Sequence, residues 1–186
     1  MKSFTAGAND VGVRLSRFVQ SVTVNLPSSL LYKSFRNKRI KINGKRAEAD
    51  YRICLNDNIE LYINDSFFAE PITKEAEPLP LSLVAPKIIF EDDNICVMYK
   101  PAGTLCHSDN TGDISLLEQF QYYLQHMGSY SGKKENRFAP ALCNRIDRGT
   151  EGLVIGAKCY TALRDMNEII RLNQLKKQYL CIVRGT

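Results

Sequence analysis

Two stripes of apolar residues at helical spacing lie near the start of the chain. The first comprises Leu15, Phe18, Val19 and Val22, and the second, after the start signals Pro27 and Ser28, comprises Leu30, Leu31 and Phe35. Apolar residues three and four apart share one face of a helix, so the pattern predicts two short amphipathic helices. The period then changes to two, because Ile40 and Ile42 alternate with polar residues before the turn pair Asn43-Gly44. This predicts a hairpin, and two further short strands are predicted to end at Cys54 and Ile63.

A second set of patterns begins at Lys87. Two strands are predicted around the acidic turn at 91–94, and Pro101 and Gly103 then force a loop. Ser115 and Glu118 have capping-box spacing, which predicts the start of a helix. Strands are predicted on both sides of the turn in ALCNRIDRGTEGLVIGAK, residues 141–158. They are followed by a helix whose apolar face comprises Leu163, Met166, Ile169 and Ile170. The segment KKQYLCIVRGT, residues 176–186, is predicted to be another strand.

The segment between these two sets is rich in proline and acidic residues. Its four prolines are Pro71, Pro78, Pro80 and Pro86. Proline disrupts helix interiors and central strands, so this segment predicts a linker. We therefore expect an α+β protein with one domain over residues 1–64, a linker over 65–86, and a second domain over 87–186 that is built on a mixed, mainly antiparallel sheet.

Positive charge is concentrated at the N-terminal end. The chain carries a formal charge of +5, and residues 1–63 alone hold 11 basic and 5 acidic side chains. Seven of the basic residues lie between positions 33 and 46 with no acidic residue among them: Lys33, Arg36, Lys38, Arg39, Lys41, Lys45 and Arg46. A solvated basic face is one interpretation. The other is a site for a polyanion, because phosphate groups relieve the repulsion among clustered cations.

Composition narrows the class of protein further. Apolar residues make up 44% of the chain, enough for a packed core, and no apolar run is long enough to span a membrane. The six cysteines are scattered among apolar residues without a Cys-x-x-Cys pair, which is typical of core residues rather than of a disulfide framework or a metal site. We expect a cytoplasmic monomer that binds no metal and contacts no membrane.

The segment 141–158 contains an Arg-x-Asp pair, Arg145 and Asp147, between two apolar runs. A buried aspartate needs a partner, and Arg145, Arg148 or the amides of the following turn could supply one. An ion pair that braces a hairpin fits this pattern. An aspartate held ionised at a loop edge, able to act as a nucleophile or base, fits it equally well.

Two resemblances favour the second interpretation. Residues 13–63 resemble the alpha-L RNA-binding motif, which a small-subunit ribosomal protein, tyrosyl-tRNA synthetases and many RNA-modifying enzymes share. NRIDRGTEGLVIGAK resembles the signature of the RluA family of RNA pseudouridine synthases, with Arg145, Asp147, Thr150, Gly152 and Leu153 on its defining positions. The upstream IIFEDDNICVMYKPAGTLCH and the downstream KKQYLCIVRG resemble the other recognised stretches of that family, in the same order.

The RluA resemblance implies an isomerase that converts uridine to pseudouridine in structured rRNA or tRNA without a cofactor. It implies the essential catalytic role for Asp147. Arg145 would fill the space of the flipped base or bind its phosphate, and Tyr179 would pack on the uracil. Asn144 stands where many relatives carry histidine. The alpha-L resemblance implies RNA-backbone contacts for the seven basic residues of segment 33–46.

The resemblance also implies a later Thr-Gly-Arg/Lys-x-His-Gln-type stretch whose basic residue pairs with the aspartate. The chain does not contain this stretch, so we expect an incomplete and inactive catalytic domain. A non-catalytic RNA-binding module is the alternative function. A glycosidase-like hydrolase fits less well, because such enzymes use two carboxylates and only Glu151 lies near Asp147 in sequence.

Overall fold

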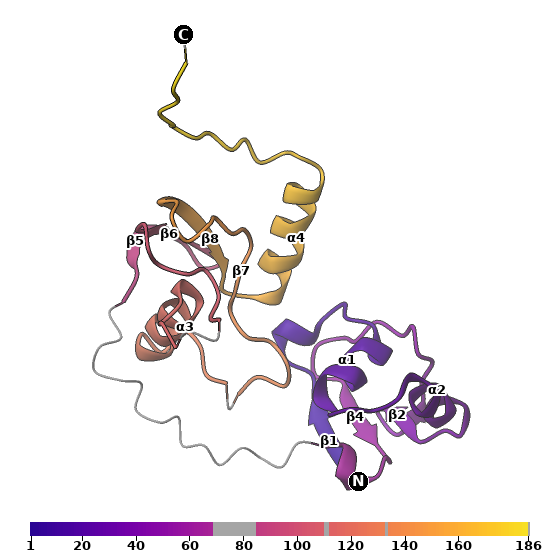
Figure 1. The fold of residues 1–186 in the computed structure, drawn as a ribbon. Coiled ribbons are helices and arrows are strands. Elements are labelled where there is room, and N and C mark those ends of the chain that lie inside the picture. The colour runs from indigo at the N-terminus through magenta and orange to yellow at the C-terminus, as the bar shows by residue number, and fades with distance from the viewer. Residues whose placement is uncertain (69–84, 110–111, 133, 186) are drawn as a thin grey trace.

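The structure is a computed structural model that describes residues 1–68, 85–109, 112–132 and 134–185. The N-terminal unit is a four-stranded antiparallel sheet covered by two helices (Figure 1). In chain order its elements are β1 (Lys2–Thr5), the 3-10 helix η1 (Ala8–Asp10), α1 (Leu15–Val22), α2 (Ser28–Arg36), β2 (Ile40–Ile42), β3 (Lys45–Arg46), β4 (Asn58–Leu61) and the 3-10 helix η2 (Asp65–Phe67). The sheet order is β1-β4-β2-β3.

Both predicted helices of this unit are present, and their apolar stripes face the core. Leu15, Phe18 and Val19 of α1 and Leu31 and Phe35 of α2 are buried. Isoleucines of β2 and β4 meet them from the sheet. Because each element is short, its stability depends on this shared core rather than on helix propensity alone.

The predicted hairpin at Asn43-Gly44 is confirmed. β2 and β3 pair antiparallel on either side of it, and both turn residues have positive φ, 52° and 74°. A two-residue turn with positive φ at both central positions matches the right-handed twist of the strands, which explains the Asn-Gly pair.

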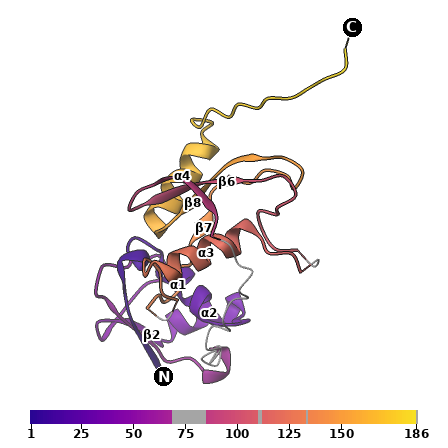
Figure 2. The ribbon, with the colours of Figure 1, turned by 90° about the vertical axis from the view of Figure 1, so that its left-hand side faces the viewer.

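The C-terminal unit is a second four-stranded antiparallel sheet, in the order β5-β6-β8-β7. Its elements are β5 (Lys87–Glu91), β6 (Ile95–Lys100), α3 (Leu116–His126), β7 (Ala141–Leu142), β8 (Gly152–Ala157) and α4 (Tyr160–Arg171). α3 covers one face of the sheet (Figure 2), and Met98, Phe120 and Val154 are fully buried between them. The predicted capping box at the start of α3 is formed by Ser115 and Glu118. The predicted α+β class with antiparallel sheets is confirmed.

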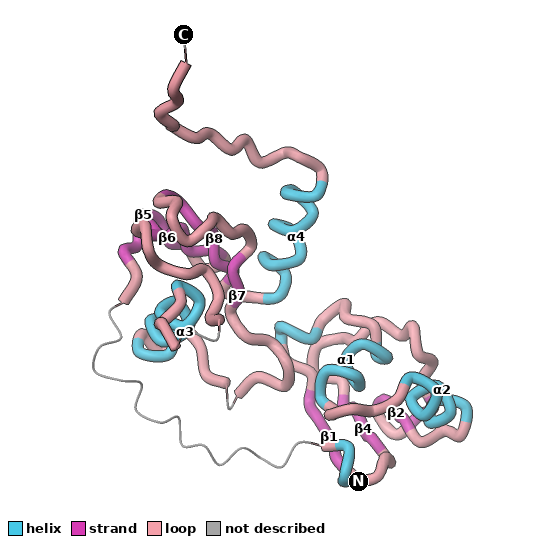
Figure 3. Tube along the Cα trace, viewed as in Figure 1, coloured by secondary structure: helices cyan, strands magenta, loops and turns pink. Residues whose placement is uncertain are grey.

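The strand predicted over residues 176–186 is wrong for the residues that the structure describes. Residues 175–185 lead away from the end of α4 without regular structure (Figure 3). Leu180 and Ile182 are fully exposed in this segment, and Val183 is 78% exposed. A strand exists only where a neighbouring strand takes its backbone hydrogen bonds, and no described strand pairs with this segment.

Other boundaries differ from the predictions as well. The strand expected to end at Cys54 is reduced to one bridge between Arg14 and Arg52, whereas β1 was not predicted. The first residues of the predicted linker form η2, and Phe68 after it is buried in the N-terminal core. The predicted linker residues 69–84 lie outside the described residues. All six cysteines are free, and Cys54 and Cys181 are exposed rather than in the core.

Within the described ranges, no helix combines the length and apolarity that a membrane crossing requires.

Candidate active site

Arg145 and Asp147 lie in the loop that joins β7 to β8, and both are exposed. The backbone amide of Thr150 donates a hydrogen bond of 3.1 Å to the Asp147 carbonyl, which closes the loop into a turn. Gly152 then begins β8 with a φ of 148°, in a region that side chains disfavour. This turn leaves the Asp147 carboxylate at the surface, beside the start of the central strand β8.

Of the partners that the sequence allowed for Asp147, Arg148 forms its ion pair with another residue. Arg148 donates a 2.7 Å hydrogen bond and ion pair to Asp113, and its Nε donates to the Gly103 carbonyl at 3.0 Å. The Gly103 amide in turn donates to the Arg148 carbonyl at 2.7 Å. In the described part of the chain, neither Arg145 nor Asp147 forms an ion pair. Asp147 is therefore held by its backbone, and its side chain is left available.

Beneath this loop lies a buried lysine that the sequence analysis did not single out. Lys100, the last residue of β6, is fully buried, and its ammonium donates to the carbonyls of Pro101, Thr104 and Arg148 at 3.2, 2.7 and 3.2 Å. Burial lowers the pKa of Lys100 below its usual value, and electrostatic interactions with Cys106 and Asp147 partly offset that shift. One ammonium thus ties the Pro101–Thr104 loop to the loop that carries Asp147.

The period-two alternation along β6 could have shown from the sequence that this lysine faces inward. Cys96 and Met98 point into the core, and Lys100 occupies the next position of the same period-two series. A charged residue at an inward position requires specific partners, and carbonyl oxygens at the end of the strand provide them.

Asn144, where many relatives carry histidine, has a structural role. Its side-chain oxygen accepts a 2.8 Å hydrogen bond from the Ile155 amide, and its side-chain nitrogen donates to the Leu153 carbonyl at 3.4 Å. The side chain thereby extends the pairing of β7 with β8 by one step. An amide suits this position because it both accepts and donates.

Tyr179 and Asp147 lie on different segments of the chain. It lies in the irregular segment after α4, and 65% of its surface is exposed. With Asn144, Ile146 and residues 149–153 it lines a cavity of about 870 Å³ between that segment and the sheet. Neither Arg145 nor Asp147 is among the lining residues. The structure therefore places Tyr179 near the loop between β7 and β8. Among the described contacts, none joins the side chains of Tyr179, Arg145 and Asp147.

The seven basic residues between positions 33 and 46 gather on one part of the N-terminal unit. They lie at the end of α2 and along the β2–β3 hairpin, and all except the half-buried Lys41 are exposed. Arg46 forms an ion pair of 3.2 Å with Glu48, and Lys41 lies 5.1 Å from the Tyr62 ring centre. Among the described residues the other five have no ion pair, which leaves a concentrated positive surface.

Comparison with known proteins agrees with the predicted family. The sequence model of the RNA pseudouridylate synthase family matches residues 94–186, a range that contains Arg145, Asp147 and Tyr179. The chain belongs to this family. The structure holds no cluster of metal-ligating side chains within its described residues.

Several named relatives resemble the whole chain. Ribosomal large subunit pseudouridine synthase C of Escherichia coli is 30% identical over 180 residues, which cover 96% of this chain and 53% of the relative. An uncharacterized RNA pseudouridine synthase of Mycoplasma pneumoniae is 33% identical over 177 residues, which cover 93% of this chain and 52% of the relative. The chain thus spans about half the length of the curated relatives that it matches. Among solved structures, Human RNA Pseudouridylate Synthase Domain Containing 4 aligns over 47% of this chain and 30% of its own, with 22% identity and a TM-score of 0.37.

Proposed function

We propose that the protein isomerises uridine to pseudouridine in structured RNA, with ribosomal RNA of the large subunit as the first substrate to test. The family match over residues 94–186 carries this proposal, because it covers the loop in which Asp147 is exposed and free of ion pairs among the described residues. The names of the relatives point to the large-subunit RNA.

The reaction breaks the bond from ribose C1′ to uracil N1, rotates the base, and joins C1′ to uracil C5. C5 then loses its proton and N1 gains one, so the atoms of substrate and product are the same. It is an isomerisation, so it needs no oxidant or reductant. Asp147 would act as nucleophile or base on the sugar or the uracil, and an exposed carboxylate is accessible to a base that has left its stack. Arg145, two residues away and also exposed, would occupy the vacated space or bind the phosphate. Tyr179 would pack on the uracil and could take part in the loss of the C5 proton.

The N-terminal unit is proposed to bind the RNA backbone. Its two helices followed by a hairpin agree with the alpha-L resemblance, and its basic residues between positions 33 and 46 present their charge at the surface. Phosphate contacts of this kind position a protein on RNA without reading its sequence. Target choice would then depend on the shape of the RNA and on the site around Asp147.

Asp147→Asn tests the assignment. The purified protein is incubated with large-subunit ribosomal RNA, and pseudouridine is detected by carbodiimide modification and primer extension. The variant should lose activity by at least about a thousandfold, because it lacks the anionic oxygen. Its melting temperature should stay within about 2 °C, as expected for an exposed side chain without an ion pair.

Asp113→Asn is the matched control. It removes a carboxylate from the neighbouring loop and breaks the pair with Arg148, so its effect should be on stability more than on chemistry. Pseudouridine formation by Asp147→Asn at the wild-type rate would show the assignment to be wrong. RNA binding by the unmutated protein without any pseudouridine formation would favour the non-catalytic RNA-binding module instead.

A further inference from the structure

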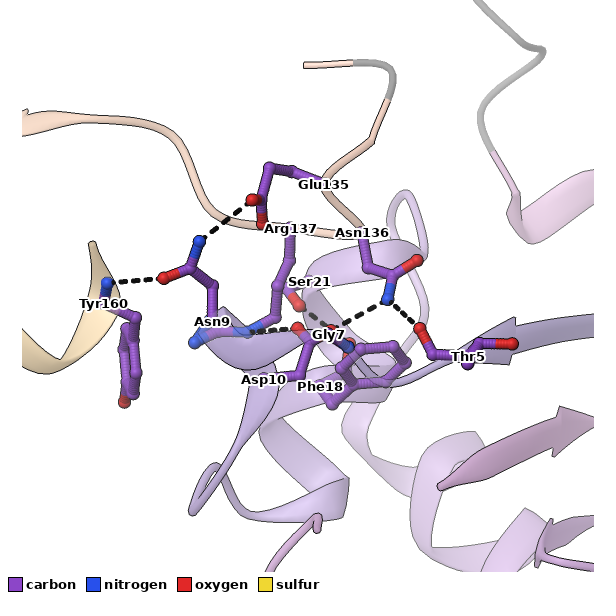
Figure 4. Close-up of polar contacts among 10 residues, drawn as sticks. All are labelled: Thr5, Gly7, Asn9, Asp10, Phe18, Ser21, Glu135, Asn136, Arg137 and Tyr160. Atoms are coloured by element: carbon purple, nitrogen blue, oxygen red, sulfur yellow. Dashed lines mark hydrogen bonds and ion pairs between the residues drawn. The ribbon is translucent and has the colours of Figure 1, made fainter. Parts of the chain in front are cut away.

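The N-terminal unit and α4 meet at a junction built from polar contacts (Figure 4). The side-chain oxygen of Asn9 accepts a 2.8 Å hydrogen bond from the Tyr160 amide, at the first residue of α4. The side-chain nitrogen of Asn9 donates a hydrogen bond of 2.9 Å to the Glu135 carboxylate. The Tyr160 ring packs against the N-terminal core, and the Arg137 guanidinium lies 4.6 Å from its centre. These contacts fix Tyr160 against the N-terminal unit.

A polar cavity of about 400 Å³ opens beside Tyr160. Its walls include three arginines and two neutral polar side chains: Arg14, Arg17, Arg52, Ser16 and Gln20. Arg14 and Arg52 form an antiparallel β-bridge, so their side chains start from adjacent backbone positions. Arg52 is partly fixed, because its Nη1 donates to the Gly12 carbonyl at 2.7 Å.

The positive charge of this cavity is not neutralised within the described structure. None of its three arginines forms an ion pair among the described residues. Like charges opposite each other on paired backbone are unfavourable, and three guanidinium groups around one cavity increase that cost. A bound anion would remove the repulsion.

The guanidinium groups, rather than the start of α1, supply the attraction for an anion. The first amides of α1 are already occupied, because Leu15 donates to the Tyr51 carbonyl at 2.8 Å and Ser16 to the Ala49 carbonyl at 2.9 Å. Arginine presents paired donors whose geometry matches two phosphate oxygens, and the side chains of Ser16 and Gln20 add further donors. The lining therefore suits a phosphodiester group.

We propose that this junction cavity binds a phosphate of the RNA backbone, at a site separate from the basic residues between positions 33 and 46. This inference rests on the proposed function in RNA modification. Because Tyr160 belongs to α4 and the arginines to the N-terminal unit, an RNA segment bound there contacts both units. Binding would then set the position of the RNA relative to the half of the molecule that carries Asp147.

The double variant Arg14→Gln/Arg17→Gln tests the cavity, because neither side chain has a described hydrogen bond or ion pair to lose. Affinity for a structured ribosomal RNA fragment is measured by fluorescence anisotropy between about 50 and 300 mM salt, the range in which counterion release dominates. The slope of log affinity against log salt should become shallower by about 1 to 2. Arg14→Lys/Arg17→Lys keeps the charges and should retain the wild-type slope.

Arg164→Gln/Arg171→Gln is the charge-matched control. It removes two positive charges from α4, where each arginine already pairs with a neighbouring carboxylate, so the slope should not change. Melting temperatures show whether every variant is folded. If the double variant does not fold, Arg17→Glu alone introduces a repulsive charge on the exposed face of α1 and should flatten the slope in the same direction.

Failure of this inference can be separated from failure of the proposed function. Arg36→Ala/Arg39→Ala/Lys41→Ala should weaken RNA binding whether or not the cavity takes part. If this triple variant loses affinity while Arg14→Gln/Arg17→Gln keeps the wild-type slope, the cavity proposal is wrong and RNA binding stands. If both bind as the wild type does, the RNA-binding assignment itself is contradicted. Loss of inorganic phosphate binding in the double variant with an unchanged RNA slope would mean a free-anion site, which also overturns the proposal.

Discussion

At the scale of single residues, Glu91 connects three elements of the C-terminal unit. At the end of β5 it accepts hydrogen bonds from Lys158 after β8 at 2.7 Å and from the Tyr123 hydroxyl of α3 at 2.6 Å. Burial raises the pKa of Glu91, but the bonds from Lys158 and Tyr123 outweigh it, so the pKa lies below its usual value. The same carboxylate raises the pKa of Tyr123 to about 12. Ionised Glu91 therefore stabilises the folded state.

Glu91→Gln should lower stability in a pH-dependent way. A carboxyl group whose folded pKa is depressed contributes stability above its unfolded pKa, about 4.3, and loses that contribution as pH falls through the folded pKa. At pH 7 we expect a loss of about 2 kcal/mol, or roughly 4–8 °C in melting temperature. The difference from wild type should shrink between about pH 5 and pH 3. Circular dichroism melts across this range measure it.

Glu48→Gln is the control for this prediction. It removes a carboxylate whose pair with Arg46 is largely exposed, and such pairs contribute little. A loss for Glu91→Gln that stayed constant down to pH 3 would contradict an ionised Glu91 as the stabilising species.

The predicted catalytic residues show what local sequence can and cannot reveal. Arg145 and Asp147 stand out because charged residues interrupt two apolar runs, and the structure places both in an exposed loop. The partner of Arg148 could not be predicted, since Asp113 lies 35 positions away in a segment without periodicity. The position of Tyr179 could not be predicted either, because it depends on how residues after α4 lie against the rest of the molecule.

At the scale of elements, the predictions that rest on contacts between near neighbours are the ones that are confirmed. Helix α1 begins at the first residue of its apolar stripe, α2 begins after the start signal Pro27, and α3 begins at its capping box. The β2–β3 hairpin forms where a turn pair follows a period-two alternation. The strand expected over 176–186 has suitable residues but no described partner strand. β1 was missed because its four residues give too short an alternation, and its pairing with β4 joins positions far apart in the chain.

The packing of α3 on β8 depends on a glycine. A Cβ at Gly156 would lie 2.6 Å from Cε1 and 2.7 Å from Cζ of Phe120, and 3.0 Å from Cε of Met98. Gly156→Ala should therefore push α3 from the sheet and cost about 1–3 kcal/mol, or roughly 3–9 °C in melting temperature. Gly149→Ala is the control, because nothing lies within 4 Å of its Cβ position. Equal melting temperatures for the two variants would contradict the close approach.

At the scale of the whole molecule, the junction between the two units was not predictable from the sequence. The chain reads as two patterned regions separated by a proline-rich segment, and the residues that join them lie in irregular segments. Asn9 and Asp10 belong to the short helix η1, and Glu135, Asn136 and Arg137 to a loop more than a hundred positions later. No periodicity links such residues, so only the three-dimensional structure shows that they meet.

Asp10 is the centre of this junction, and its removal should uncouple the two units. The side chain is buried and accepts hydrogen bonds from the Gly7 amide at 3.0 Å and from Asn136 at 2.8 Å. The Oδ1 atom of Asp10 lies 3.6 Å from Nε of Arg137. The Arg137 side chain is largely buried, and its Nε has no described hydrogen bond. Asp10→Ala leaves this guanidinium without its counter-charge, so the loss should be about 3–5 kcal/mol.

The sharper consequence concerns cooperativity, because Asp10 bonds within its own unit through Gly7 and across the junction through Asn136 and Arg137. Calorimetry should show one unfolding transition for the wild type and two separated transitions for Asp10→Ala. Asp50→Ala, which removes an exposed aspartate of the same unit, should keep a single transition. The double variant Asp10→Ala/Arg137→Met removes the stranded charge as well, so it should recover part of the lost stability. A single transition at the wild-type temperature in Asp10→Ala would mean that the junction does not couple the units.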